Sequence, residues 1–139
     1  MNRIISPLSL GILHLAGLLV VGTICGCTNG QSTGTVNGIV TVDGKPMGGF
    51  EVIFTSSDDG TTARGYAKQQ GEYQLFVGRG SHEIPVGEYK VTVIPSAFVQ
   101  GVPEPTVKLP AAFASVEDTD LVKTVGSGAN QLDLEISTK

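Results

Sequence analysis

The sequence predicts an all-β fold, a sandwich of about seven short strands, and three observations carry this prediction. Short runs of alternating apolar and polar residues recur after residue 35, and turn-forming residues separate them. The 139-residue chain has 19 glycines, 7 prolines and only 16% charged residues, which suits a module with many turns. No stretch after residue 35 repeats its apolar residues every 3–4 positions as an amphipathic helix does. One domain with a single core is expected at this length.

Residues 36–55 form the clearest part of the pattern, two strands joined by a tight turn. Asp43 and Gly44 suit the positive φ angles of a two-residue hairpin turn. Pro46 has no N–H to donate, so it is expected where pairing stops, at an edge or a bulge. Gly48 and Gly49 permit a second bend before the next strand. The residues that alternate onto the buried faces are Val36, Gly38, Val40, Val42, Phe50, Val52 and Phe54.

The middle of the chain continues the pattern with shorter elements. A turn over 56–60 leads to an edge strand over 61–68, and a turn over 69–71 leads to a fourth strand marked by Tyr73, Leu75 and Val77. A loop over 78–87 carries His82 and Pro85. The strand over 88–94 turns Tyr89, Val91 and Val93 to one face. We expect Tyr89 to be a core residue whose hydroxyl has a hydrogen-bond partner.

The last third of the chain begins with a long loop. Residues 95–116 contain four prolines and no lasting period, and loops of this length are often functional or mobile. A short strand is predicted over 121–125 and a turn over 127–130. Leu132, Leu134 and Ile136 then alternate with polar residues, which predicts a final strand with one buried and one solvated face.

The N-terminal segment has the features of an export signal. Arg3 precedes an uncharged, mostly apolar run over residues 8–24. The ending Ile24-Cys25-Gly26-Cys27 resembles a lipobox, in which Cys27 would receive diacylglycerol, with palmitate as its fatty acid, and become the new N-terminus. The sequence thus predicts a lipoprotein signal peptide at 1–26, a lipidated flexible tether at 27–35 and the folded domain at 36–139. An uncleaved membrane anchor and a C-x-C metal or redox pair are the alternatives.

Two stretches carry a family resemblance. The run V-x-G-x-V-T-x-D-G-K-P-M-x-G-x-x-V-x-F at 36–54 and the phrase V-G-E-Y-K-V-T-V at 86–93 resemble carboxypeptidase regulatory-like, transthyretin-like domains. The likeness is closest to the small lipoproteins of planctomycete bacteria that carry this domain. It implies a seven-stranded sandwich with transthyretin-like (Ig-like, Greek-key) connectivity, displayed at a cell envelope. The matching residues are mostly structural, so the resemblance bears on fold more than on function.

The sequence pattern indicates no catalytic residue, cofactor site or metal site. The net charge of −4 gives no basic footprint for nucleic acid. His82 is the only histidine after the predicted leader, and the sequence offers it no acid–base partner. The transthyretin-like fold that the resemblance implies is shared by one enzyme, hydroxyisourate hydrolase. This chain lacks the several histidines and the terminal Y-R-G-S of that enzyme family. We therefore expect that the protein is not an enzyme. Cys27, the predicted lipidation site, is the only functional residue that the sequence predicts.

Two function hypotheses follow. The first is a membrane-anchored envelope lipoprotein that faces the periplasm or exterior and acts as a non-catalytic structural or protein-interaction module. Its partners would be membrane lipid through acylated Cys27 and envelope proteins or glycans, with no nucleic acid. The alternative is a carbohydrate or small-ligand binding module at the cell surface, with a groove built from aromatic residues, namely Tyr66, Tyr73, Phe98 and Phe113.

Two further alternatives stay open. Acidic loops at 58–59 and 117–120 could hold calcium, although neither has the spacing of an EF-hand loop. An intramolecular Lys–Asn isopeptide bond, as in some related surface sandwiches, is the other.

Overall fold

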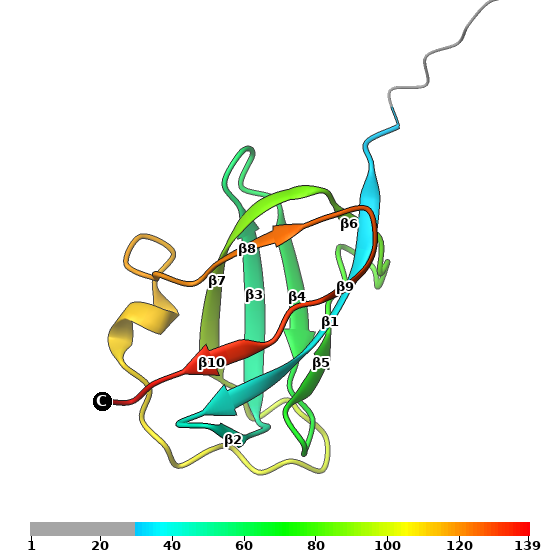
Figure 1. The fold of residues 1–139 in the computed structure, drawn as a ribbon. Helices are drawn as coiled ribbons and strands as arrows, with labels where there is room; N and C mark the ends of the chain where they lie inside the picture. The colour runs from blue at the N-terminus through cyan, green and yellow to red at the C-terminus, as the bar shows by residue number, and fades with distance from the viewer. Residues whose placement is uncertain (1–29) are drawn as a thin grey trace, which may run out of the picture.

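The computed structural model describes residues 30–139 and confirms an all-β fold of two packed sheets (Figure 1). The predicted signal peptide and Cys27 lie outside the described residues. Within residues 30–139, no helix has the length and apolar character needed to cross a membrane. The elements are β1 (Thr33–Val42), β2 (Lys45–Pro46), β3 (Phe50–Ser56), β4 (Thr62–Tyr66), β5 (Glu72–Gln74), β6 (Ile84–Pro85), β7 (Gly87–Pro95), the 3-10 turn η1 (Ala111–Ala114), β8 (Val122–Val125), β9 (Gly128–Gln131) and β10 (Leu134–Ile136).

The first sheet is organised around β1. This strand is 10 residues long, so several shorter strands pair with different parts of it. β2, β5 and β6 run antiparallel to it, whereas β9 and β10 run parallel. The second sheet is antiparallel throughout, in the order β4-β3-β7-β8. β1 thus forms the spine of one layer, and the β3–β7 pair forms the centre of the other.

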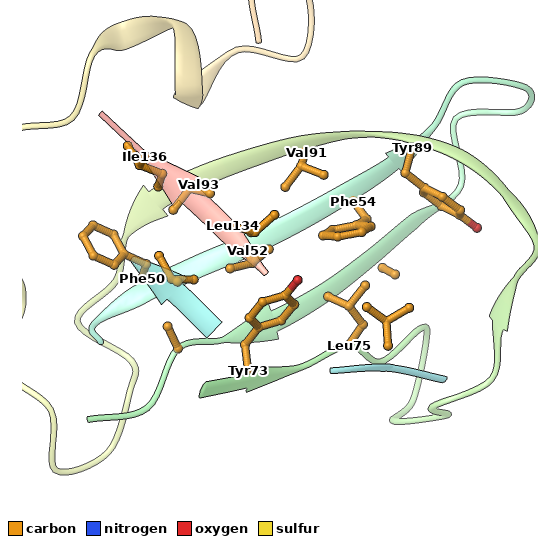
Figure 2. Packing of buried hydrophobic residues seen from close by; sticks show 14 of the residues in the cluster. Phe50, Val52, Phe54, Tyr73, Leu75, Tyr89, Val91, Val93, Leu134 and Ile136 are labelled. Carbon is orange, nitrogen blue, oxygen red and sulfur yellow. The ribbon is translucent and has the colours of Figure 1, made fainter. Parts of the chain in front are cut away.

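The core lies between the two sheets, where alternate side chains of each strand meet (Figure 2). Phe54 is fully buried at its centre, and its ring forms tilted pairs with Tyr73 and Tyr89 at centroid distances of 6.4 and 6.0 Å. The Tyr89 hydroxyl donates to the Pro85 carbonyl at 2.7 Å, so the prediction for this tyrosine is confirmed. The buried apolar residues are Val36, Val40, Val42, Phe50, Val52, Phe54, Ala63, Ala67, Tyr73, Leu75, Ile84, Tyr89, Val91, Val93, Val125, Leu134 and Ile136.

The tight turn predicted near residue 43 is present, but its partner strand is not the one expected. Asp43 and Gly44 have φ angles of 49° and 81°, as a two-residue hairpin turn requires. The turn pairs β1 with the short strand β2, which ends at Pro46. The expected pairing of β1 with residues 50–55 is wrong, because β3 lies in the opposite sheet. Alternation identifies the buried face of a strand but does not identify its neighbour.

The strand count differs from the predicted seven, since residues 30–139 contain ten strands. β2 and β6 have only two residues each, too short for a periodic signal. β9 and β10 keep one register along β1, with Asn37 opposite Gln131 and Val40 opposite Leu134. They are separated where the Asp133 carboxylate, instead of a strand carbonyl, accepts the Ile39 N–H at 2.9 Å. Transthyretin-like connectivity stays a prediction from the resemblance.

Two boundaries also differ from the prediction. β1 begins at Thr33, inside the predicted tether at 27–35, because Thr33 and Gly34 pair with β6. Residues 127–130, predicted as a turn, belong mostly to β9. Their small and amide side chains favour turns locally, but pairing with β1 overrides that preference. Residues 96–116 form a long irregular loop as predicted, interrupted only by η1, whereas Pro95, the first residue of the predicted loop, is the last residue of β7.

Candidate functional site

The titratable residues considered from the sequence do not gather into a site. His82 is exposed, and its Nδ1 lies 2.7 Å from the Leu75 carbonyl oxygen. Asp59 accepts the Thr61 N–H at 2.9 Å. Hydrogen bonds from Thr61 and, to a lesser extent, Ser56 hold the pKa of the Asp59 carboxyl below the usual value of 3.8. Within residues 30–139, no group of three or more histidine, cysteine or acidic side chains is arranged to hold a metal ion.

The four aromatic residues proposed for a sugar-binding groove are dispersed. Tyr73 lies in the core, and Phe113 packs partly buried against it. Tyr66 pairs with Phe76 on another part of the surface, with ring centroids 6.1 Å apart. Phe98 is 86% exposed in the long loop. No stacking platform of the expected composition forms from these rings.

One hollow lies where the long loop passes under the end of the first sheet. It has a volume of about 440 Å³ and is lined by Pro46, Met47, Gly48, Gln69, Val102, Pro103, Glu104, Pro105, Thr106 and Val107. Residues 95–110 and β2, called the loop pole below, lie at the end of the molecule opposite the point where the chain enters β1 (Figure 1). The backbone at Gly49 is close enough to Pro103 and Pro105 that a Cβ there would lie 2.7 Å from both. The missing side chain thus allows the loop to seat against the sandwich.

The loop is anchored at its base while its aromatic residue faces solvent. The Ser96 N–H donates to the Gly49 carbonyl at 2.8 Å, and Val102 N–H donates to the Val99 carbonyl at 3.2 Å. Val99 is 8% exposed, whereas its neighbour Phe98 is 86% exposed. Phe98 is thus a large apolar side chain held outward on the same loop whose later residues, 102–107, line the hollow.

A second hollow, of about 350 Å³, lies on the outer face of the first sheet. Its lining is polar and consists of Asn37, Gly38, Ile39, Lys68, Glu72, Tyr73, Gln74 and Gln131. Asn37 on β1 is directly opposite Gln74 on β5 and also directly opposite Gln131 on β9. These three side chains, called the amide row below, therefore cross three adjacent strands at one level. On the next level, Ile39 is opposite Glu72 and hydrogen bonds to Asp133.

The floor of this second hollow is fixed by a buried tyrosine. The Tyr73 hydroxyl crosses β1 at Gly38 and donates to the Leu132 carbonyl. A Cβ on Gly38 would lie 2.0 Å from that carbonyl oxygen, so only glycine fits there. Burial and, to a lesser extent, the charge of Asp133 raise the pKa of the Tyr73 hydroxyl.

No family model, curated protein or solved structure matches this chain. Sequence reasoning anticipated the long loop but missed the amide row, whose members are 37 and 57 positions apart along the chain. Each member was recognisable only as an outward position of a strand, since strand register is not encoded in alternation.

The raised pKa of Tyr73 predicts a loss of stability at high pH. In the unfolded chain the hydroxyl ionises near its ordinary value of 10.0, whereas the folded protein keeps it neutral. The stabilisation is therefore complete below about pH 10 and declines as the pH rises above that value. We expect the urea midpoint to be flat from pH 7 to 9 and to fall towards pH 11. Tyr73→Phe should be less stable at pH 7 but show a shallower alkaline decline; an unchanged slope would contradict this assignment.

Proposed function

We propose that this chain is a lipid-anchored module of the cell envelope that binds a partner protein at its loop pole and performs no catalysis. Its body would be a transthyretin-like sandwich facing the periplasm or exterior. The single observation that carries the proposal is that the start of β1 and the loop pole lie at opposite ends of the molecule. The chain enters β1 at one end, and the anchored loop with exposed Phe98 lies at the other (Figure 1).

The geometry supports display away from a membrane. β1 has 10 residues, which at roughly 3.3 Å per residue spans about 33 Å between the two ends. With acyl chains on Cys27, the loop pole would point away from the lipid surface and towards other envelope proteins. The partner we infer presents an apolar segment, because Met47, Val102 and Val107 line the hollow beside the loop. The only described histidine has its Nδ1 against a main-chain carbonyl, which fits a role without acid–base chemistry.

Anchoring is tested by replacing the cysteines one at a time in the full chain. Cys27→Ala is expected to abolish incorporation of a palmitate analogue and to move the protein out of the membrane fraction. Cys25→Ala is the matched control and should keep both the label and the fractionation, because position 25 precedes the proposed cleavage. Label that persists in Cys27→Ala would contradict the lipid anchor.

Partner binding is tested separately by cross-linking and affinity capture from detergent-solubilised envelope. Phe98→Ala should reduce recovery of the principal cross-linked partner at least tenfold, since exposed aromatic side chains at the centre of interfaces carry much of the binding energy. Val122→Ala, at a 45% exposed position on β8, is the control and should leave recovery unchanged. Equal recovery with both variants would argue against the loop pole while leaving the anchor intact.

A further inference from the structure

We infer that the amide row and the acidic residues beside it bind a neutral saccharide on the outer face of the first sheet. This site lies on β5, β1 and β9, which run side by side in Figure 1, and it does not depend on the loop pole. The two hollows are separated by the turn at Lys68 and Gln69, each of which lines one of them.

The three amide side chains of the row do not contribute to the stability of the fold. Asn37, Gln74 and Gln131 are all exposed. Asparagine is depleted in strands, and β-branched or aromatic residues at three mutually opposite positions would stabilise the sheet better. Within residues 30–139, the side chains of Asn37 and Gln74 make no hydrogen bond, and Gln131 donates only to Asp133, at 2.8 Å. The row therefore presents unused hydrogen-bonding groups to solvent.

The chemistry of the amide row suits a polyhydroxylated ligand. Each amide offers two N–H donors and a carbonyl acceptor, and the strand spacing places neighbouring side chains about 5 Å apart. The hydroxyls of a sugar ring both donate and accept, and two adjacent hydroxyls can engage both ends of one amide or carboxylate. Glu72 and Asp133 supply acceptors on the next level, and Ile39 between them supplies an apolar contact for a ring face.

The charged residues around the hollow favour an uncharged ligand over an anion. Lys68 and Glu72 both line it, so opposite charges meet at its rim. Asp133 adds a further carboxylate at the end of the amide row. A phosphate or other strong anion would therefore meet carboxylates, whereas an uncharged polyhydroxylated ligand meets matched donors and acceptors. The volume of about 350 Å³ lies at the lower end of the range for small-ligand sites.

The experiment uses the full chain, extracted in a detergent without a sugar headgroup. Maltohexaose, cellohexaose and chitohexaose are the probes, and saturation-transfer NMR in the presence of EDTA is the readout. We expect saturation transfer to at least one of these oligosaccharides. Asn37→Ala should weaken its binding at least tenfold, and the triple variant Asn37→Ala, Gln74→Ala, Gln131→Ala should abolish it. Gln100→Ala, an exposed amide in the long loop, is the matched control and should bind as the wild type does.

Three outcomes would overturn the inference. The first is no transfer to any of the three probes, and the second is transfer that survives the triple variant. The third is binding that appears only when calcium is added, which would assign the carboxylates to a cation instead. Because all three substituted side chains are exposed, the variants should keep the wild-type circular dichroism spectrum and melting temperature within a few degrees.

Discussion

Phe54→Ala is expected to lower the free energy of unfolding by about 3–5 kcal/mol, among the largest effects of any single truncation in this core. Phe54 is fully buried on β3, and Figure 2 shows its ring between the rings contributed by β5 and β7. Truncation removes the ring and both tilted aromatic contacts, with Tyr73 and Tyr89. It leaves a cavity between two sheets whose backbones are fixed by their own hydrogen bonds, so little collapse can refill it.

Urea unfolding at pH 7, followed by circular dichroism, measures this effect. A domain of this size has a total stability of about 5–15 kcal/mol, so the variant should be close to unfolding at 37 °C. Phe98→Ala is the matched control because it deletes the same atoms from an 86% exposed side chain, and it should change stability by less than about 0.5 kcal/mol. Similar midpoints for the two variants would show that the centre of the core is not where the structure places it.

Much of the local structure could be predicted from residue patterns, and the reason is burial. Val36 and Val42 on β1 alternate with polar residues because one face of that strand is buried in the core, and burial of one face produces a period of two in the sequence. The turn at Asp43 was predictable because few residues tolerate its positive φ angle. Pairing was not predictable, since the partners of β1 come from five separate strands as far away as residue 136.

The two candidate sites likewise have features that could be predicted from the sequence and features that could not. The long loop was visible because four prolines and the lack of a period set it apart from the strands. Its exposed aromatic residue could not be told from its buried neighbour, because Phe98 and Val99 are both apolar and adjacent. The amide row could not be predicted from the sequence, because its three members become neighbours only through the register of β5 and β9 on β1.

Gly38→Ala is expected to destabilise the protein by about 3 kcal/mol, at the upper end of the usual cost of overpacking. Its new Cβ would lie 2.0 Å from the Leu132 carbonyl oxygen and 2.7 Å from the ring of Tyr73. To relieve these close contacts, the segment at Leu132, between β9 and β10, would have to move away from β1. That movement would break both the Tyr73 hydroxyl bond to Leu132 and the 2.8 Å bond from Leu132 N–H to the Asn37 carbonyl.

A comparison with a second glycine separates this steric effect from the general cost of replacing glycine. At Gly126 the nearest atom to a new Cβ is the Asn130 side-chain oxygen at 3.5 Å, an ordinary contact, so Gly126→Ala should stay within about 0.5 kcal/mol of the wild type. In Gly38→Ala the Tyr73 hydroxyl has already lost its partner, so adding Tyr73→Phe should cost less than it does in the wild type. Additive effects of the two substitutions, or a Gly38→Ala variant as stable as Gly126→Ala, would mean that Tyr73 does not reach Leu132 across Gly38.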